Sequence, residues 1–296
     1  MQTYALASEG NDPATYNTSL DDFSAQTFHY TLRYRGLLTS MIWADLADVS
    51  MQFSKLADHS LRVVDKKPVY EFSLHLSTQN YMKAELFQAV RYTYKTLLDN
   101  KLNTLLVEES DTGDKQSHKF LWLDWQNKTL ELFRRREKIP LETGFISFSD
   151  PKQVWEKDGK IPLPSFLNTI SHAQNKSLDL IHKKTGDAIN VSSVHDPLSL
   201  IYAIRRQASN VNSPLLSQTI AIAVSDDIRL YHVKKEAQES LIINQQNIAT
   251  TKYQIHTDEK EDDYFYLWLS DDQQKRPLKM AMDAPLGEIE INLLPK

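Results

Sequence analysis

Glycine and cysteine are the residues that this sequence most clearly lacks. Its 296 residues include seven glycines and no cysteine, whereas glycine usually makes up roughly 7% of a protein. No two of these glycines form a GxG motif, so the glycine-rich loops that bind phosphate in P-loop and dinucleotide-binding proteins are absent. Without cysteine there is no disulfide, no thiolate nucleophile, no Cys-ligated metal and no lipid-modified cysteine anchor.

The sequence also lacks an excess of positive charge and a long apolar run. Lysine and arginine number 34 against 39 acidic residues, for a net charge of −5. Nucleic-acid-binding proteins usually present a dominant basic face, so we expect no nucleic-acid partner. The longest uncharged stretch, residues 207–225, contains asparagine, proline and several hydroxyl side chains. It does not resemble a membrane span of about 20 apolar residues, and we expect no such span.

The first residues carry a weak signal for export. Ala5-Leu6-Ala7 has the small-x-small form that precedes signal-peptidase cleavage, and polar and acidic residues follow it. No basic or apolar segment stands before it, so residues 1–7 are either the end of an incomplete signal peptide or a chance match. Residues 1–24 hold four acids and no lysine or arginine, and we predict that they form a flexible lead-in.

Alternation of apolar and polar residues is the dominant pattern from residue 25 onward. Within residues 28–34 the period is two, as in a strand with one buried face. The pattern recurs in about a dozen segments, which predicts a mainly β protein, either a curved antiparallel sheet or an open β-barrel, with a few short helices. Because glycine is scarce, we expect Asn and Asp to take the turn positions that need a positive φ. The other predicted strands are residues 41–53 (as one bent strand or two), 70–76, 92–95, 102–107, 121–125, 130–133, 220–224, 228–233, 241–243, 249–255, 264–269, 278–282 and 288–293.

Two segments have helical patterns, and a third has no clear pattern. Asp196 can cap a helix, Pro197 suits its first position, and apolar residues follow at helical spacing. Residues 81–90 are rich in helix formers and could form a short helix or a strand. Residues 139–194 contain four prolines in mixed polar sequence. We predict an inserted loop there, with short helices near 166–172 and 178–182, within a single β-rich domain that covers residues 25–296.

Local motifs for catalysis and metal binding are missing. The sequence contains no HExxH, HxH or GxSxG. Ser199 is expected to satisfy free amides at the helix start, and His29 and His75 fall on polar, solvent-facing strand positions. Asp124, in an aromatic strand, and Asp196 are the best carboxylate candidates, and acid–base chemistry would need a second group close to one of them. We expect no enzyme activity, no cofactor and no metal.

Aromatic residues make up 10% of the chain, and many lie on the predicted strands. Packing of these rings against one another explains most of this pattern. A curved sheet faced with Trp, Tyr and Met could instead line a cavity for an acyl chain or another apolar ligand. Sequence alone leaves both the filled core and the cavity open.

Several short segments, in order along the chain, resemble a known family. Together they are similar to the bacterial domain of unknown function 3108 family, over roughly residues 25–294. The resemblance implies a β-rich protein exported to the Gram-negative periplasm, and it carries over no catalytic residue. The motif positions are Gly36 at the end of the first strand, Asp124 and Trp125, the helix start with Asp196, Leu198 and Ser199 followed by Arg205, and the late strands with Trp268 and Pro277.

The sequence departs from the family pattern in two places. The stretch between Asp124-Trp125 and Asp196-Pro197 is longer, which makes residues 139–194 the most individual part of the chain. A Thr-Pro-x-Gly turn expected before a late strand is missing at Asn247-Ile248-Ala249-Thr250. This absence leaves the register of that strand open.

The leading functional hypothesis is a non-enzymatic protein of the periplasm. It would bind a lipid or another apolar or amphipathic ligand, or a protein partner in envelope assembly. The hypothesis rests on the aromatic strand faces, the missing catalytic motifs and the family resemblance. One alternative is a hydrolase of an envelope polymer with Asp124 as its acid, which would need a second carboxylate within about 10 Å. The other alternative is a structural scaffold.

Overall fold

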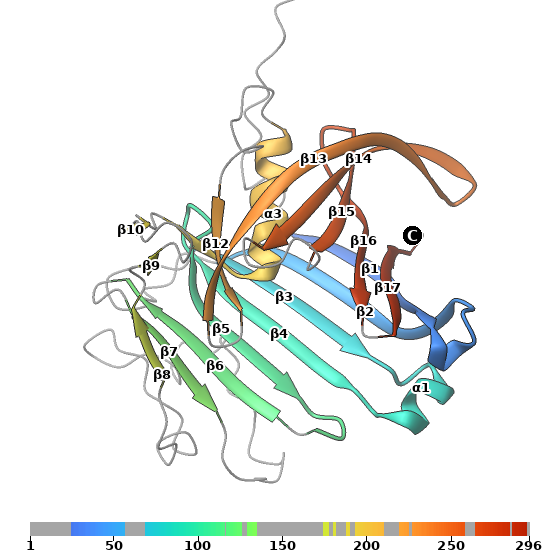
Figure 1. Ribbon diagram of the computed structural model, residues 1–296, viewed down its shortest axis with the longest axis horizontal. Coiled ribbons are helices and arrows are strands. Elements are labelled where there is room, and N and C mark those ends of the chain that lie inside the picture. The colour runs from blue at the N-terminus through green and yellow to red at the C-terminus, as the bar shows by residue number, and fades with distance from the viewer. Residues whose placement is uncertain are drawn as a thin grey trace, which may run out of the picture.

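The computed structural model consists mainly of strands, with two α-helices and one 3-10 turn among the residues that it describes. These residues are 25–56, 69–115, 117–125, 129–134, 174–177, 180–181, 188–189, 193–209, 219–224, 227–257, 264–284 and 286–294. The elements, labelled in Figure 1, are β1 (Gln26–Gly36), η2 (Leu37–Thr39), β2 (Ala44–Lys55), β3 (Tyr70–Ser77), α1 (Met82–Phe87), β4 (Arg91–Leu98), β5 (Thr104–Asp111), β6 (Ser117–Asp124), β7 (Thr129–Arg134), β8 (Gln174–Ser177), β9 (Leu180–Ile181), β10 (Ala188–Ile189), β11 (Val194–His195), α3 (Pro197–Ala208), β12 (Thr219–Val224), β13 (Asp227–Ile243), β14 (Gln246–Thr257), β15 (Tyr264–Ser270), β16 (Pro277–Ala284) and β17 (Gly287–Leu293).

Fifteen of the strands form one curved sheet. Their order is β11-β12-β13-β14-β15-β16-β17-β1-β2-β3-β4-β5-β6-β7-β8, and the end strands β11 and β8 do not pair with each other in the described part of the chain. Only the short β11 runs parallel to its neighbour there. Strand β17 pairs with β1, so the first and last strands lie side by side in the middle of the sheet order. The prediction of a mainly β protein built on a curved, open antiparallel sheet is confirmed.

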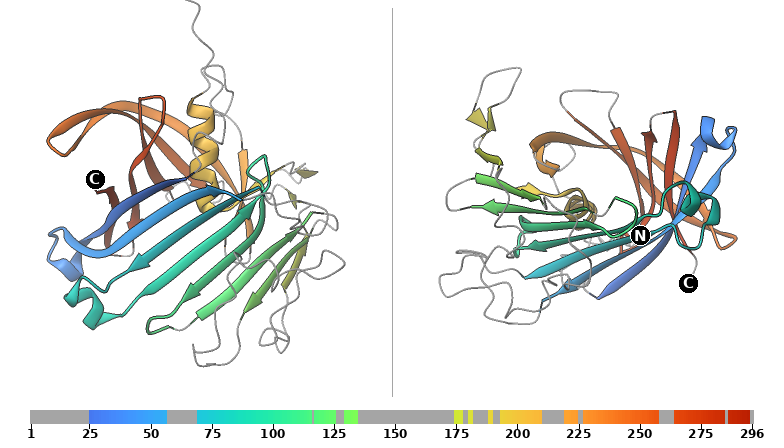
Figure 2. Two further views of the ribbon diagram at one scale, coloured as in Figure 1. Left: turned by 180° about the vertical axis from the view of Figure 1, so that it is seen from behind. Right: turned by 90° about the horizontal axis from the view of Figure 1, so that it is seen from below.

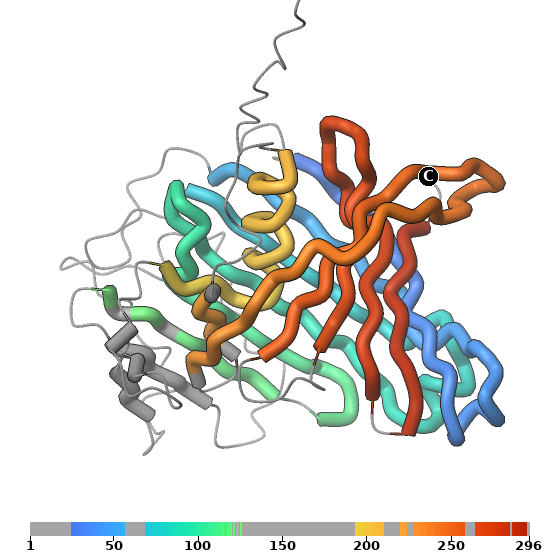
Figure 3. Tube along the Cα trace, turned by 45° about the horizontal axis from the view of Figure 1, so that its top comes forward, coloured from blue at the N-terminus to red at the C-terminus, as the bar shows by residue number. Residues whose placement is uncertain are grey.

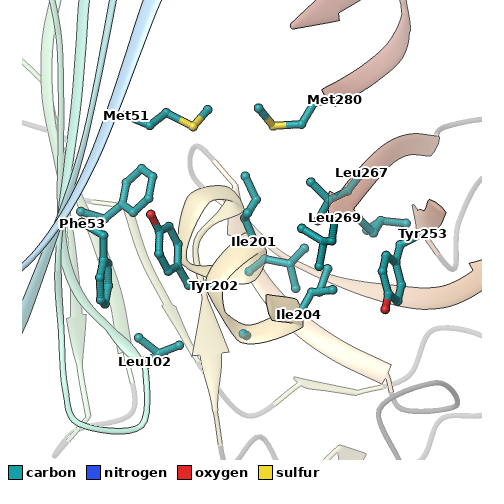
Figure 4. Packing of buried hydrophobic residues seen from close by; sticks show 14 of the residues in the cluster. Met51, Phe53, Leu102, Ile201, Tyr202, Ile204, Tyr253, Leu267, Leu269 and Met280 are labelled. Carbon is teal, nitrogen blue, oxygen red and sulfur yellow. The ribbon is translucent and has the colours of Figure 1, made fainter. Parts of the chain in front are cut away.

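The concave side of the sheet is filled by α3 and by inward-facing strand residues. The strands curve so that two walls face each other, with α3 between them (Figures 1 and 2). Tyr202 of α3 stacks on Phe53 of β2 with ring centroids 4.3 Å apart. On the other side of the helix, Leu267 and Leu269 of β15 lie beside Ile204 (Figure 4). Of the two alternatives that the aromatic strands left open, the structure supports the filled core.

Two sequence-based expectations about elements are wrong. Residues 228–233 and 241–243 belong to one strand of 17 residues, β13, rather than to two. Residues 234–240 are exposed, so no buried face imposes the alternation that would have revealed a continuous strand. Within the expected helix at 178–182, Leu180–Ile181 form β9 and pair with β10. The segment 166–172 and the lead-in 1–24 lie outside the described residues, and residues 81–90 contain helix α1.

The expectation that Asn and Asp supply the positive φ angles is largely wrong. Among the described non-glycine residues, eight have a positive φ, and Asn244 is the one Asn or Asp among them. It forms the β13–β14 turn with Gln245, at φ values of 54° and 62°. Two consecutive left-handed residues suit a tight hairpin turn, and Ile243 then pairs with Gln246. This turn fixes the register that the missing Thr-Pro-x-Gly motif had left open.

Aspartates set other turns through their side chains instead. Asp99 Oδ1 accepts hydrogen bonds from the backbone amides of Lys101 at 2.8 Å and Asn103 at 2.9 Å. The left-handed position of this turn falls to Leu102, with φ 66°. The side-chain bonds hold the backbone of the turn, so a leucine can occupy a conformation that it would otherwise disfavour.

Gly36 lies where β1 and β17 approach too closely for a side chain. It pairs with Gly287, and the ring of Tyr34 lies across the pair and donates a hydrogen bond to the Leu286 carbonyl at 2.9 Å. A Cβ atom at Gly36 would lie 2.2 Å from the Tyr34 hydroxyl and 2.3 Å from the Leu286 oxygen. Its φ of 175° is ordinary extended backbone, so contact and not conformation requires glycine.

We therefore expect Gly36→Ala to lower the free energy of unfolding by roughly 1–3 kcal/mol, as overpacking does. Urea denaturation measures this loss. His29→Ala is the control, because His29 lies on the same strand and is exposed. Equal stability of the two variants would contradict the close contact.

Candidate functional site

The start of α3 is closed by a capping box, as the sequence predicts. Asp196 Oδ1 accepts hydrogen bonds from the backbone amides of Leu198 at 2.9 Å and Ser199 at 3.2 Å. Ser199 Oγ accepts in return from the Asp196 amide at 2.9 Å. Both side chains are fully buried, so Ser199 has the predicted role at the helix start and is closed to a substrate.

Asp196 also ties the helix to the sheet. The Tyr94 hydroxyl of β4 donates to Asp196 Oδ1 at 3.2 Å, and the Thr104 hydroxyl of β5 donates to Oδ2 at 3.0 Å. Burial, and then the nearby Asp196 charge, raise the pKa of Tyr94 well above its usual value. The Asp196 carboxylate accepts four hydrogen bonds and is fully buried, so its role is structural and no substrate can reach it for acid–base catalysis.

Arg205 fastens the other half of the helix. Its Nε donates to the Lys275 carbonyl, and its Nη2 donates to Gln26 Oε1 and to the Gln274 carbonyl, each at 2.9 Å. The guanidinium lies 4.6 Å from the Tyr202 ring centroid. Burial lowers the pKa of Arg205, and Tyr202 opposes that shift. This motif residue thus links α3 to β1 and to the β15–β16 turn.

The remaining motif residues are dispersed over the sheet. The Pro277 carbonyl accepts a hydrogen bond from the Tyr30 hydroxyl at 2.9 Å, and Trp125 Nε1 donates to the Thr104 carbonyl at 2.9 Å. The backbone of Asp124 pairs with Thr129 at the end of β6. Its side chain lies outside the described residues, so the hydrolase hypothesis stays untested.

The structure also contains a buried pair that the sequence analysis missed. His118 Nε2 and Glu108 Oε1 lie 2.8 Å apart, with side chains 4% and 5% exposed. They come from neighbouring strands at diagonal positions, and only the strand register could have revealed this. Nearby, burial raises the pKa of Glu71, and Lys95 opposes that shift. With so little exposure, the pair offers no access for a substrate.

The face of the sheet opposite α3 carries charged and aromatic side chains in register. Lys252, Trp268, Lys279 and Asn292 occupy neighbouring positions on β14, β15, β16 and β17. The Lys252 ammonium lies 3.6 Å from the Tyr266 ring centroid, and that of Lys279 lies 5.0 Å from the Trp268 centroid. Such contacts hold cations over aromatic faces, and the Trp268 side chain, 7% exposed, is buried beneath Lys252 and Lys279.

A groove of about 390 Å³ lies between this face and the tip of the β13–β14 hairpin, which projects beyond the neighbouring strands (Figure 3). Its polar floor is paired: Lys279 Nζ lies 2.5 Å from Glu290 Oε1, and Arg33 Nε lies 2.8 Å from Asp45 Oδ1. The residues along the hairpin side are Leu241, Ile242, Ile243 and Asn244, and those on the floor include Arg33, Lys279, Glu290 and Asn292.

The groove was not predicted from the sequence, because the expected ligand site lay on the concave side of the sheet and the groove lies on the opposite face. The available signal was the apolar run Leu241-Ile242-Ile243 at the tip of a hairpin whose preceding residues are polar. Within the described residues, no three His, Asp or Glu side chains form a group that could hold a metal ion. No helix of that part of the chain has the length and apolar character needed to cross a membrane.

Comparison with known families supports the resemblance for the second part of the chain. Residues 168–293 match the model of a protein family of unknown function, DUF3108. The matched part contains the motif residues from Asp196 to Pro277. Gly36 and Asp124-Trp125 lie before it, so the match is shorter than the span from residue 25 that the motifs suggested. The division into one domain with an insertion at 139–194 stays a prediction.

Two further comparisons concern curated proteins and solved structures. No curated protein matches the chain. Among solved structures, the crystal structure of a β-barrel-like protein of domain of unknown function DUF1849 from Brucella abortus is similar. The alignment covers 92% of this chain and 96% of that chain, at 8% identity and a TM-score of 0.47. We draw no functional conclusion from a likeness at this score.

The cap at Asp196 yields a direct test of its structural role. Asp196→Ala removes the cap, which costs about 0.5–2 kcal/mol, and leaves two buried hydroxyls without their acceptor, which costs about 1–3 kcal/mol. We expect the free energy of unfolding in urea to fall by about 2–4 kcal/mol. Asp196→Asn keeps one acceptor oxygen, so the free energy of unfolding of this variant should fall by less.

Asp45→Ala is the control for this measurement. It removes a carboxylate whose side chain is 53% exposed and which pairs with Arg33 at the surface, and such pairs contribute about 0–1 kcal/mol. An Asp196→Ala protein as stable as Asp45→Ala would rule out this structural role of Asp196.

Proposed function

We propose that this chain is a non-enzymatic, exported protein of the bacterial cell envelope that binds an amphipathic ligand in the groove beneath the β13–β14 hairpin. One observation carries the proposal: the groove joins an apolar wall to an ionic floor, while α3 fills the concave side. Its volume of about 390 Å³ falls within the usual range of small-molecule sites, about 300–1,000 Å³.

The chemistry of the groove indicates the kind of ligand. Leu241 and Ile243 provide apolar contact for an acyl chain. The floor presents cations, Lys279 and Arg33, beside the carboxylate of Glu290. Because positive and negative groups alternate there, a head group that carries both charges fits the floor better than a purely anionic one. The ligand class is therefore a zwitterionic amphiphile.

Two further observations support a non-enzymatic protein of the envelope. Asp196 and Ser199, both weighed for chemistry, are buried in the helix cap. The sequence Ala5-Leu6-Ala7, which has the form that precedes signal-peptidase cleavage, and the periplasmic location implied by the family resemblance support the location. A protein partner in envelope assembly could use the same surface, and the scaffold alternative needs no ligand, so a binding measurement separates these ideas.

Dodecylphosphocholine, used below its micelle concentration, is a suitable probe. Titration calorimetry should detect binding to the wild type, and Lys279→Ala should weaken it by about tenfold, equivalent to about 1.4 kcal/mol, because the variant removes the floor cation. Lys234→Ala is the matched control, since Lys234 is an exposed lysine on β13 that is not among the groove residues.

Three results would contradict the proposal. The first is no binding by the wild type, and the second is equal binding by the Lys279→Ala and Lys234→Ala variants. The third is binding by both variants at a site that is exposed only when the protein unfolds. Circular dichroism and the urea midpoint of each variant identify this third result.

A further inference from the structure

One end of the molecule gathers most of its exposed large apolar side chains. Eleven such side chains are exposed in the described part of the chain, and eight of them belong to three turns. We call this surface the apolar end. Its residues are Leu37, Leu38, Met41 and Ile42 after β1, Met82, Leu86 and Phe87 in α1, and Leu286 between β16 and β17, with exposed fractions from 61% to 82%.

The three turns lie side by side. The Leu37 amide donates a hydrogen bond to the Leu286 carbonyl at 3.1 Å, which joins the first turn to the β16–β17 turn. Tyr81, at the start of α1, donates to Asp48 of β2 at 2.8 Å. Figures 1 and 2 show the β1–β2 turn and α1 next to each other at the same end of the sheet. The apolar end is thus one surface and not a scatter of single residues.

Helix α1 is turned so that its apolar side faces solvent. Glu85 forms an ion pair with Arg91 of β4 at 2.6 Å, on the side of the helix toward the sheet. Leu86 and Phe87 are 82% and 81% exposed, and no residue of the helix is buried. A surface helix usually buries its apolar side. The reverse orientation, held by an ion pair, prepares α1 for contact with something outside the protein.

The first turn is held in a similar way. The Met41 amide donates to the Gly36 carbonyl at 2.9 Å. Ser40 and Met41 have φ values of 51° and 62°, a left-handed backbone that is uncommon for a side chain as large as methionine. The hydrogen bond therefore keeps Met41 at the surface, where the side chain is 61% exposed.

The side chains next to the apolar end are of the types that are common at a membrane interface. Arg33 and Arg35 lie 5.5 and 5.0 Å from the Trp43 ring centroid, and Lys83 is exposed on α1. Tryptophan and basic residues are typical of the head-group level, just above inserted apolar side chains. Two of the adjacent acids pair with arginines: Glu288 with Arg35 at 2.7 Å and Glu85 with Arg91. Neither acid would then strongly repel lipid phosphate.

We propose that the apolar end docks on a lipid bilayer, with the three turns inserted to the depth of the head groups and Trp43, Arg33, Arg35 and Lys83 at the level of the phosphates. Projecting turns suit a deformable lipid surface better than a rigid partner, which would need a complementary shape. This docking goes beyond ligand binding in the groove: the two surfaces share Arg33, but the apolar wall of the groove, residues 241–244, lies on a different hairpin from the three turns.

Flotation with vesicles of phosphatidylethanolamine and phosphatidylglycerol tests the proposal on the full chain. The wild type should float with the vesicles. The double variant Leu86→Ser/Phe87→Ser should lose binding by about tenfold or more, since it removes two inserted side chains, and it should stay folded because neither side chain is buried. Leu294→Ser is the matched control, because Leu294 is 37% exposed, lies at the opposite end of β17 from Leu286 and is not among the groove residues. This variant should float like the wild type.

Each other outcome would overturn the proposal. A wild type that does not float, or a double variant that floats as well as Leu294→Ser, means that the apolar end does not bind lipid. If light scattering shows a wild-type dimer that the double variant loses, a second copy of the chain covers this surface instead. Since Lys279 borders the groove, whereas Leu86 and Phe87 do not, failure of docking and failure of ligand binding are distinguishable.

Discussion

The burial of α3 against both walls of the curved sheet is the contact on which the rest of the structure depends. Leu200, Tyr202 and Ile204 are at most 1% exposed. Asp196 anchors the beginning of the helix to β4 and β5, and Arg205 anchors its other half to β1 and to the β15–β16 turn. One helix therefore joins strands that are far apart in the sheet order, and it holds the curved sheet together without pairing between the end strands β11 and β8 in the described part of the chain.

Because the concave side of the sheet is filled, both proposed binding surfaces lie on the outside of the sheet. Open β-barrels often bind ligands within, but here the interior positions hold Phe53, Met280 and the helix side chains. The outer face presents a groove with an ionic floor and, at another place, an apolar end. Both surfaces suit amphipathic molecules, and a protein that holds such a molecule while resting on a bilayer would meet its ligand where that ligand is most concentrated.

Much of the fold could be predicted from the sequence, because its signals are local. Alternation identified β1 and β3, and the Asp196 cap with Pro197 identified α3. The middle of β13 was missed because residues 234–240 are exposed. The groove, the His118–Glu108 pair and the outward face of α1 depend on strand register and on packing between distant segments, which no local pattern encodes. The turn expectation failed because side-chain hydrogen bonds let Leu102 take a left-handed conformation.

Native-state hydrogen exchange tests the central role of α3 most directly. If the helix joins the two walls, the amides of Tyr202 and Ile204 can exchange only when the whole protein unfolds. Their opening free energy should then equal the global free energy of unfolding measured in urea, and it should equal that of the β1 and β2 amides. Exchange of the α3 amides through a local opening, while the amides of β1 and β2 stay protected, would contradict this role.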